Sequence, residues 1–126
     1  VPMSGLYEWQ KRAGGGKQPM FIRPEGEAFF AAAGLWEHWQ SNDGSEILSC
    51  TILTTSPNEF MEPIHNRMPV FLKEEDYDVW LDREAPLPAV ASLLTAYPAE
   101  RMSAYGVSTY VNNVRNEGEG CIEPIG

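Results

Sequence analysis

Long apolar runs, cysteine and positive charge are all scarce in this sequence of 126 residues. No window approaches eighteen consecutive apolar residues, and the first residues resemble no signal peptide, so we expect no membrane-crossing or targeting segment. The two cysteines, Cys50 and Cys121, lie far apart and form no CxxC pair, which favours a reduced, intracellular protein over a disulfide scaffold. The two cysteines and two histidines also lack the close paired spacing of a zinc site, and we expect no metal or other cofactor.

Lysine and arginine number 9 against 18 acidic residues, which gives a net charge of −9. Because affinity for phosphate comes mainly from lysine and arginine, this balance excludes a protein that coats duplex nucleic acid, and any nucleic-acid role must be local. Glycine-containing motifs of hydrolases and nucleotide-binding proteins are absent as well: there is no G-x-S-x-G elbow, no P-loop and no dinucleotide-binding fingerprint.

What is present is ordinary globular composition, with 43% hydrophobic and 21% charged residues, and many turn formers, with 11 glycines and 10 prolines. Alternating and β-branched runs predict strands over residues 4–9, 18–23, 28–36, 46–55, 70–72, 102–107 and 109–114. Helices are predicted over residues 56–61, 74–81 and 89–96. We therefore predict one α+β domain over residues 1–126, with a curled, barrel-like, mostly antiparallel sheet and two or three short helices.

Two local signals support these assignments. Three glycines, Gly14 to Gly16, separate the first two predicted strands, which is typical of a β-hairpin. Ser56, Pro57 and Glu59 form a capping box with proline at the first helical position, which predicts the start of a helix.

His65 is the strongest candidate for chemistry. It follows the predicted capped helix, stands beside Arg67, and lies between Pro63 and Pro69, which stiffen the backbone. Histidine titrates near neutral pH and suits general acid and base catalysis. The alternative is an ordinary hydrogen-bonded histidine in a surface loop. The other histidine, His38, has tryptophans close by on both sides and is interpreted as structural.

Glu8 stands between Tyr7 and Trp9, so strand alternation places its carboxylate on the face opposite both rings. That carboxylate either faces solvent or lines a cleft, where it would serve proton transfer.

The hairpin holds the one basic island of the chain. With the aromatic side chains near it, this island predicts a small phosphate-binding and base-stacking surface for single-stranded nucleic acid. The alternative is simple solubilisation of a hairpin tip. The residues concerned are Trp9, Lys11, Arg12, Lys17 and Arg23.

Five segments together resemble the C-terminal part of the SOS response-associated peptidase (SRAP) family. The combination of G-x-Y-E-W, T-T-x-P/A followed by I-H-x-R-M-P, and V-S-x-x-V-N is specific. The matching segments are GLYEWQ (5–10), KQPMFIRP (17–24), AAAGLWE (31–37), CTILTTSPNEFMEPIHNRMPVFL (50–72) and VSTYVNNVRNEGEGCIEP (107–124).

The resemblance implies a sensor of abasic sites in single-stranded DNA, with autocatalytic cysteine peptidase and abasic-site lyase-type activity. An N-terminal cysteine joins the ring-opened sugar aldehyde as a thiazolidine. Glu8 corresponds to the family glutamate that handles protons around the cysteine amine, and His65 to the histidine that assists ring opening, Schiff-base formation and reversal. Trp9, the basic hairpin and Arg67 would contact DNA. The resemblance also implies a cytoplasmic, bacterial, nucleoid-associated protein without an obligate protein partner.

The family's N-terminal M-C-G-R segment and its N-A-R-x-E stretch have no counterpart here. Neither Cys50 nor Cys121 replaces the missing nucleophile, because each lacks a free α-amine. We therefore expect a truncated SRAP-like domain, either part of a longer product or a remnant, and a polypeptide of residues 1–126 that forms no crosslink. A non-catalytic module that binds single-stranded DNA, or a structural remnant, remains the alternative.

Overall fold

The computed structural model describes all residues, 1–126, as an α+β fold in which every strand pair is antiparallel. The strands are β1 (Pro2–Met3), β2 (Leu6–Lys11), β3 (Lys17–Pro24), β4 (Phe30–Ala32), β5 (Gly34–Gln40), β6 (Glu46–Ile52), β7 (Thr54–Thr55), β8 (Met68–Pro69), β9 (Phe71–Leu72) and β10 (Met102–Gly106). The helices are η1 (Glu74–Asp76), α1 (Tyr77–Leu81), α2 (Leu87–Ala91), η2 (Ala99–Arg101), η3 (Thr109–Asn112) and η4 (Glu119–Cys121). No helix is long and apolar enough to cross a membrane.

The sheets are small and none closes on itself, so the predicted barrel-like sheet is wrong. The orders are β10-β3-β2, β1-β4-β9, β5-β6 and β7-β8. The sheets stay small because two long predicted strands are interrupted, one at Ala33 and one at Leu53. Ala33 donates its N–H to Val70 and accepts from the N–H of Leu53, so the run 28–36 changes partners between β4 and β5. Leu53, which also accepts from the N–H of Val70, divides the run 46–55 into β6 and β7 in the same way.

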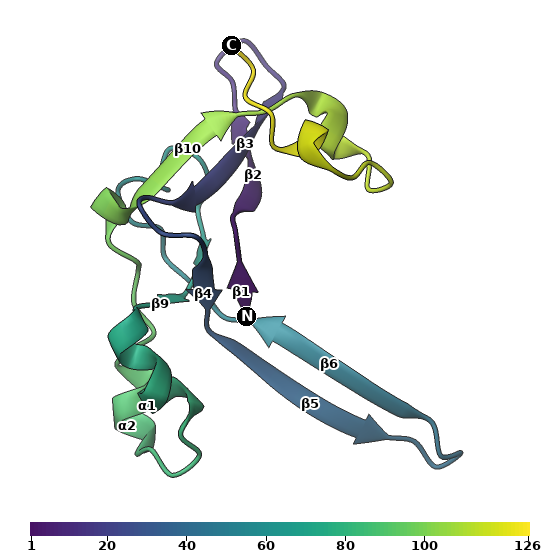
Figure 1. Ribbon diagram of the computed structural model, residues 1–126, viewed down its shortest axis with the longest axis vertical. Helices are drawn as coiled ribbons and strands as arrows, with labels where there is room; N and C mark the ends of the chain where they lie inside the picture. Colours follow the sequence, from purple (N-terminus) through teal and green to yellow (C-terminus); the bar gives the residue numbers. More distant parts are fainter.

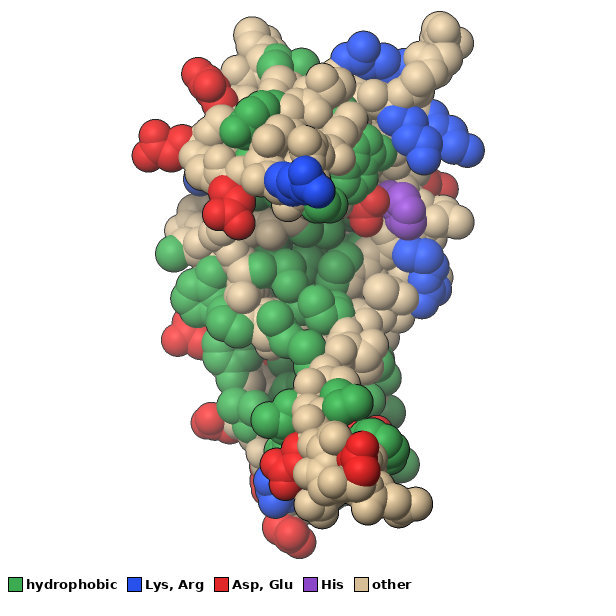
Figure 2. All heavy atoms as spheres, turned by 90° about the vertical axis from the view of Figure 1, so that its right-hand side faces the viewer, with side chains coloured by type: hydrophobic (Ala, Val, Ile, Leu, Met, Phe, Trp, Pro, Cys, Tyr) green, Lys and Arg blue, Asp and Glu red, His purple; other side chains and the backbone are tan.

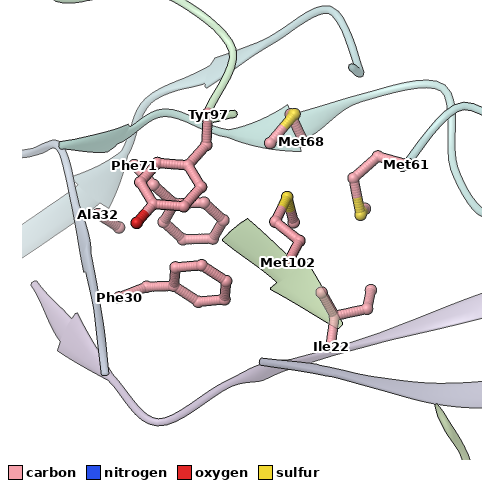
Figure 3. Packing of buried hydrophobic residues seen from close by; sticks show 8 residues of the cluster. All are labelled: Ile22, Phe30, Ala32, Met61, Met68, Phe71, Tyr97 and Met102. Atoms are coloured by element: carbon pink, nitrogen blue, oxygen red, sulfur yellow. The ribbon is translucent and has the colours of Figure 1, made fainter. Parts of the chain in front are cut away.

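The main hydrophobic core joins the two three-stranded sheets. Phe30 of β4 and Phe71 of β9 stack with ring centroids 4.0 Å apart, and Tyr97 meets both rings edge-on (Figure 3). Methionines fill the remaining irregular space, a role that suits their flexible side chains. The members of the cluster are Ile22, Phe30, Ala32, Met61, Met68, Phe71, Tyr97 and Met102.

The predicted hairpin is confirmed, since β2 pairs with β3 through Leu6↔Ile22 to Lys11↔Lys17. The helix predicted at 74–81 is present as η1 followed by α1. The helix predicted at 89–96 is only partly correct, because α2 begins two residues earlier and already ends at Ala91. The strand predicted at 109–114 is wrong, because residues 109–112 form η3 and no strand follows them.

The segment 56–61 contains no regular helix, and its turn is organised by Asn58 instead of the predicted capping box. The Asn58 side chain accepts from the N–H of Met61 and donates to the carbonyl of Tyr97 at 2.6 Å. The backbone then makes single turns, in which Glu62 bonds to Asn58 and His65 to Met61. This turn fixes the loop that carries His65 against the core.

Two parts stand out from this body. The hairpin of β5 and β6, here called the ribbon, extends away from the rest of the chain (Figure 1). The C-terminal residues 107–126, here called the strap, return along the β10-β3-β2 sheet, where Ile125 bonds to Gly106 and Val107 pairs with Pro124.

Candidate active site

Strand β2 directs its side chains to two different neighbours, as its alternation predicts. Tyr7 and Trp9 reach the strap: the Tyr7 hydroxyl donates to the carbonyl of Cys121 at 3.1 Å. Glu8 and Gln10 reach the loop after residue 58, where the Gln10 amide donates to the carbonyl of Pro63 at 3.1 Å. Glu8 therefore lies on the face opposite the two rings.

Gly5 explains why β2 approaches its neighbour so closely. A Cβ atom at this position would lie 2.6 Å from the carbonyl oxygen of Ile22 and would also collide with the ring of Phe21. Only glycine fits at this point, immediately before the residues of the site.

The ring of His65 is held through Nδ1 by the backbone of Arg67. Nδ1 lies 3.2 Å from the Arg67 nitrogen and 3.1 Å from its carbonyl oxygen. A neutral Nδ1 accepts from this N–H, and a protonated Nδ1 donates to this carbonyl. The backbone of Arg67 thus orients the imidazole in either protonation state and leaves Nε2 free to face Glu8.

Glu8 and His65 meet although they are distant in sequence. Nε2 of His65 lies 3.7 Å from Oε2 of Glu8, and their side chains are 42% and 21% exposed. Solvent therefore reaches the imidazole more readily than the carboxylate. A carboxylate and an imidazole in this arrangement can exchange and relay protons with a bound molecule. The two predicted catalytic side chains thus lie side by side, and their roles stay predictions.

His65 lines a groove of about 400 Å³, whereas Glu8 is not among the lining residues. The groove combines an indole and two ammonium groups with the His65 loop, and two of its eight lining residues are hydrophobic. Figure 2 shows one histidine on this face next to an acidic side chain, with lysine or arginine side chains above and below it. The lining residues are Trp9, Lys11, Lys17, Glu62, Pro63, Ile64, His65 and Asn66.

Of the cations predicted to contact DNA, Lys11 and Lys17 line the groove, whereas Arg12 and Arg67 lie outside its lining. Lys11 and Lys17 are directly opposite each other on β2 and β3. Arg12 is exposed and donates to the side chain of Gln18. Arg67 is exposed and donates to the carbonyl and hydroxyl of Thr54 at 2.9 and 3.0 Å, so its guanidinium is held in a fixed position.

Sequence reasoning missed three residues that hold this site together. Asn112 of the strap accepts from the Trp9 indole N–H at 2.7 Å, and Gln10 and Thr54 hold the His65 loop and Arg67. Asn112 belongs to the V-S-x-x-V-N pattern, but nothing in the pattern says which side chain it meets.

The Tyr7 hydroxyl, which contacts the strap, is protonated at neutral pH. Burial raises the pKa of the Tyr7 hydroxyl, and the neighbouring Cys121 thiol and Tyr105 hydroxyl raise it further. Tyr7 therefore stays neutral and remains the donor to Cys121. Tyr105 makes the equivalent bond to Ile122 at 2.8 Å.

His38 makes a second histidine–glutamate pair, 3.5 Å from Glu46, on the exposed ribbon and away from the groove. Cys50 is exposed on the ribbon and Cys121 is half-buried in the strap. No group of three or more histidine, cysteine, aspartate or glutamate side chains is placed to hold a metal ion.

Comparisons with known proteins agree with the sequence motifs. The sequence model of the SOS response associated peptidase (SRAP) family matches residues 1–114. The chain is 42% identical over 124 residues to the abasic site processing protein YoqW of Bacillus subtilis, covering 98% of this chain and 55% of that protein. It is 37% identical over 145 residues to the abasic site processing protein HMCES of Gallus gallus, covering 99% of this chain and 43% of that protein.

Solved structures show the same fold. A crystal structure of a protein from Bacteroides thetaiotaomicron matches with a TM-score of 0.90 and 28% identity, over 99% of this chain and 55% of that one. A crystal structure from Bordetella bronchiseptica matches with a TM-score of 0.76 and 30% identity, over 86% and 53%. The chain therefore spans about half the length of the relatives it matches.

Proposed function

The chain belongs to the SOS response associated peptidase (SRAP) family, and on this premise we propose that it takes part in sensing abasic sites in single-stranded DNA and in forming a covalent crosslink to them. The observation that carries the proposal is the Glu8–His65 pair, 3.7 Å apart beside a groove with an indole and two lysines.

The proposed product is a thiazolidine, as the family resemblance implies. The ring-opened abasic sugar offers an aldehyde; a cysteine α-amine adds to its carbon, water leaves, and the cysteine thiol adds to the resulting imine carbon. The net reaction consumes one aldehyde and one N-terminal cysteine and releases one water. Cys50 and Cys121 have no free α-amine, so in this proposal the reacting cysteine lies outside residues 1–126.

Within this reaction Glu8 accepts and returns protons at the cysteine amine. His65 delivers a proton to the sugar oxygen as the ring opens, and it assists loss of water from the carbinolamine and the slow reverse reaction. The backbone of Arg67 holds the imidazole in one orientation in both protonation states, because its N–H donates to a neutral Nδ1 and its carbonyl accepts from a protonated one.

Binding is assigned to the groove and its rim. The Trp9 ring offers a surface on which an unpaired base stacks, and the cations neutralise phosphates of a single strand. These cations are Lys11, Arg12, Lys17 and Arg67. Since the net charge is −9, we assign affinity to this local group rather than to the whole surface.

The test uses the protein expressed from its complete reading frame and a single-stranded oligonucleotide with one abasic site. A denaturing gel should show a covalent species for the unchanged protein and much less for Glu8→Gln. His38→Gln is the matched control, because His38 pairs with a glutamate away from the groove. Full crosslinking by Glu8→Gln would overturn the proposed role of the pair.

A second arm separates catalysis from binding alone. A polypeptide of residues 1–126 begins with Val1, so it should bind single-stranded DNA without forming a crosslink, and its affinity should fall as salt rises. A covalent species formed by this polypeptide would refute the thiazolidine route. Salt-sensitive binding by the complete protein without any crosslink would instead identify a non-catalytic binding module.

A further inference from the structure

Strand β2 meets the His65 loop (residues 59–67) through two polar contacts that run antiparallel to each other in sequence. Glu8 faces His65, with 3.7 Å between Oε2 and Nε2, and the Gln10 amide donates to the Pro63 carbonyl at 3.1 Å. Glu8 and Gln10 are two positions apart and therefore share one face of the strand. Pro63 and His65 are two positions apart along the loop in the opposite direction. The second contact therefore lies where it can fix the register of the first.

The Gln10 amide makes the one hydrogen bond between β2 and the His65 loop. The other side chains of β2 that form hydrogen bonds, Tyr7 and Trp9, reach the strap. On the loop side, the Pro63 carbonyl accepts from no backbone N–H, so Gln10 is its partner in the protein. The proline ring also fixes φ at this position, which restricts the backbone that carries the acceptor.

The remaining contacts of the His65 loop hold it to other parts of the molecule. Met61 is fully buried in the main hydrophobic core and Ile64 packs against that core. The Arg67 guanidinium is bonded to Thr54 of β7. Apolar packing has no fixed direction, whereas a hydrogen bond sets narrow limits on distance and angle. These contacts therefore anchor the loop without setting its separation from β2.

The pair of Glu8 and His65 does little to hold itself together. Its side chains are 21% and 42% exposed, and ion pairs in contact with solvent contribute little to stability. The separation of carboxylate and imidazole must therefore be maintained by a neighbouring contact, and the Gln10 bond is the directional one that spans the same gap.

We propose that Gln10 is a positioning residue for the Glu8–His65 pair. Its amide holds the His65 loop at the separation from β2 at which carboxylate and imidazole reach the same bound molecule. Proton transfer requires hydrogen-bond distances, so a displacement of about 1 Å removes a large part of the rate. The expected loss of rate rests on the proposed function, whereas the expected change in geometry does not.

Three variants of the complete protein test the loss of rate. Gln10→Met keeps the length of the side chain and removes the donor, so at saturating single-stranded DNA with one abasic site it should form the crosslink about five- to tenfold more slowly. Affinity for the DNA and the midpoint of denaturant unfolding should stay unchanged. Gln10→Lys keeps a donor that reaches the carbonyl and should recover most of the rate. Gln40→Met is the matched control, because Gln40 is exposed at the end of β5, away from the groove. Equal rates for Gln10→Met and Gln40→Met would overturn the proposal.

NMR of the His65 imidazole tests the geometry without any crosslinking. Its ring signals respond to the carboxylate 3.7 Å away, so Glu8→Gln should shift them in the otherwise unchanged protein. In the Gln10→Met background the same change should shift them less than half as far, because the two groups are no longer held together. The signal that disappears in His65→Ala identifies the residue, and the His38 signals should stay fixed because His38 lies on the ribbon.

The two measurements separate this proposal from the proposed function. An equal response to Glu8→Gln in both backgrounds would refute the positioning role, whatever happens to the rate. A reduced response in a protein that forms no crosslink would support the positioning role and count against the abasic-site chemistry instead.

Discussion

At the scale of single residues, His65 and Arg67 are close in sequence but have different proposed roles, proton transfer for His65 and phosphate binding for Arg67. We predict that His65→Ala in the complete protein slows crosslink formation and reversal by about 10²–10⁴-fold, the usual contribution of a general acid or base. Affinity for single-stranded DNA should change little, because a loop imidazole contributes little to phosphate binding. The measurement is the rates set beside equilibrium affinity. Unchanged rates with lower affinity would make His65 a binding residue.

Arg67→Ala is the companion variant. It removes the guanidinium held by Thr54 but keeps the backbone N–H and carbonyl that orient His65. Affinity should fall, and the slope of log affinity against log salt should decrease by about 0.7, as for one phosphate contact on a single strand. A loss of rate at saturating DNA would show that the side chain also acts in the chemistry.

Asn112 is predicted to position Trp9. Asn112→Ala removes the acceptor of the indole N–H and should weaken binding of single-stranded DNA several-fold, since such a bond contributes about 0.5–1.5 kcal/mol. In a Trp9→Ala background the same change should have no further effect, which a double-mutant cycle measures. Asn113→Ala is the control, because the Asn113 side chain bonds to Arg115 instead. Additive losses would contradict the coupling.

At the scale of elements, the close approach of β2 to β3 depends on Gly5. Gly5→Ala brings a methyl group against the Ile22 carbonyl and should lower the free energy of unfolding by about 1–3 kcal/mol. Gly14→Ala, in the hairpin loop with open space around it, should change stability far less. Denaturant unfolding of both variants compares them, and equal stability would show that β2 can shift without cost.

The turn of the ribbon is held by an ionised carboxylate. Bonds from Ser41 and Ser45 lower the pKa of Asp43 from 3.8 to about 2. Because the folded turn favours the carboxylate, this stabilisation is present above pH 3.8 and is lost as the pH falls through about 2. The NMR shift of the Ser45 amide, which bonds to Asp43, should titrate with that midpoint and stop titrating in Asp43→Asn. A midpoint near 3.8 would contradict the assignment.

At the scale of the whole molecule, stability is unevenly distributed. Only 15 of 126 residues are buried, and they gather in the body, whereas the strands of the ribbon contain none. We predict that backbone amides of β5 and β6 exchange with solvent much faster than those of β3 in a polypeptide of residues 1–126. Hydrogen exchange followed by mass spectrometry measures the difference. Equal protection would show that the ribbon is stable without a covering layer.

The sequence alone determined the local elements whose signals are short in range. The glycine-rich hairpin, the strand at residues 102–107 and the acidic start of the helix at Glu74 follow from neighbouring residues, and the structure contains all three. The motifs around Glu8 and His65 also sufficed to identify the family. Alternation along β2 even gave the correct face for Glu8, because side-chain direction in a strand has a period of two.

Features that depend on contacts between residues distant in the chain were decided by the tertiary structure. The open sheets follow from backbone bonds of Ala33 and Leu53 to distant residues, and the turn before His65 follows from Asn58 reaching Tyr97. The sequence predicts a strand in the run 46–52, but its exposure on the ribbon is visible only in the folded chain. A sequence pattern shows which side chains are apolar, but their burial depends on what packs against them. Only the folded chain shows that nothing packs against the strands of the ribbon.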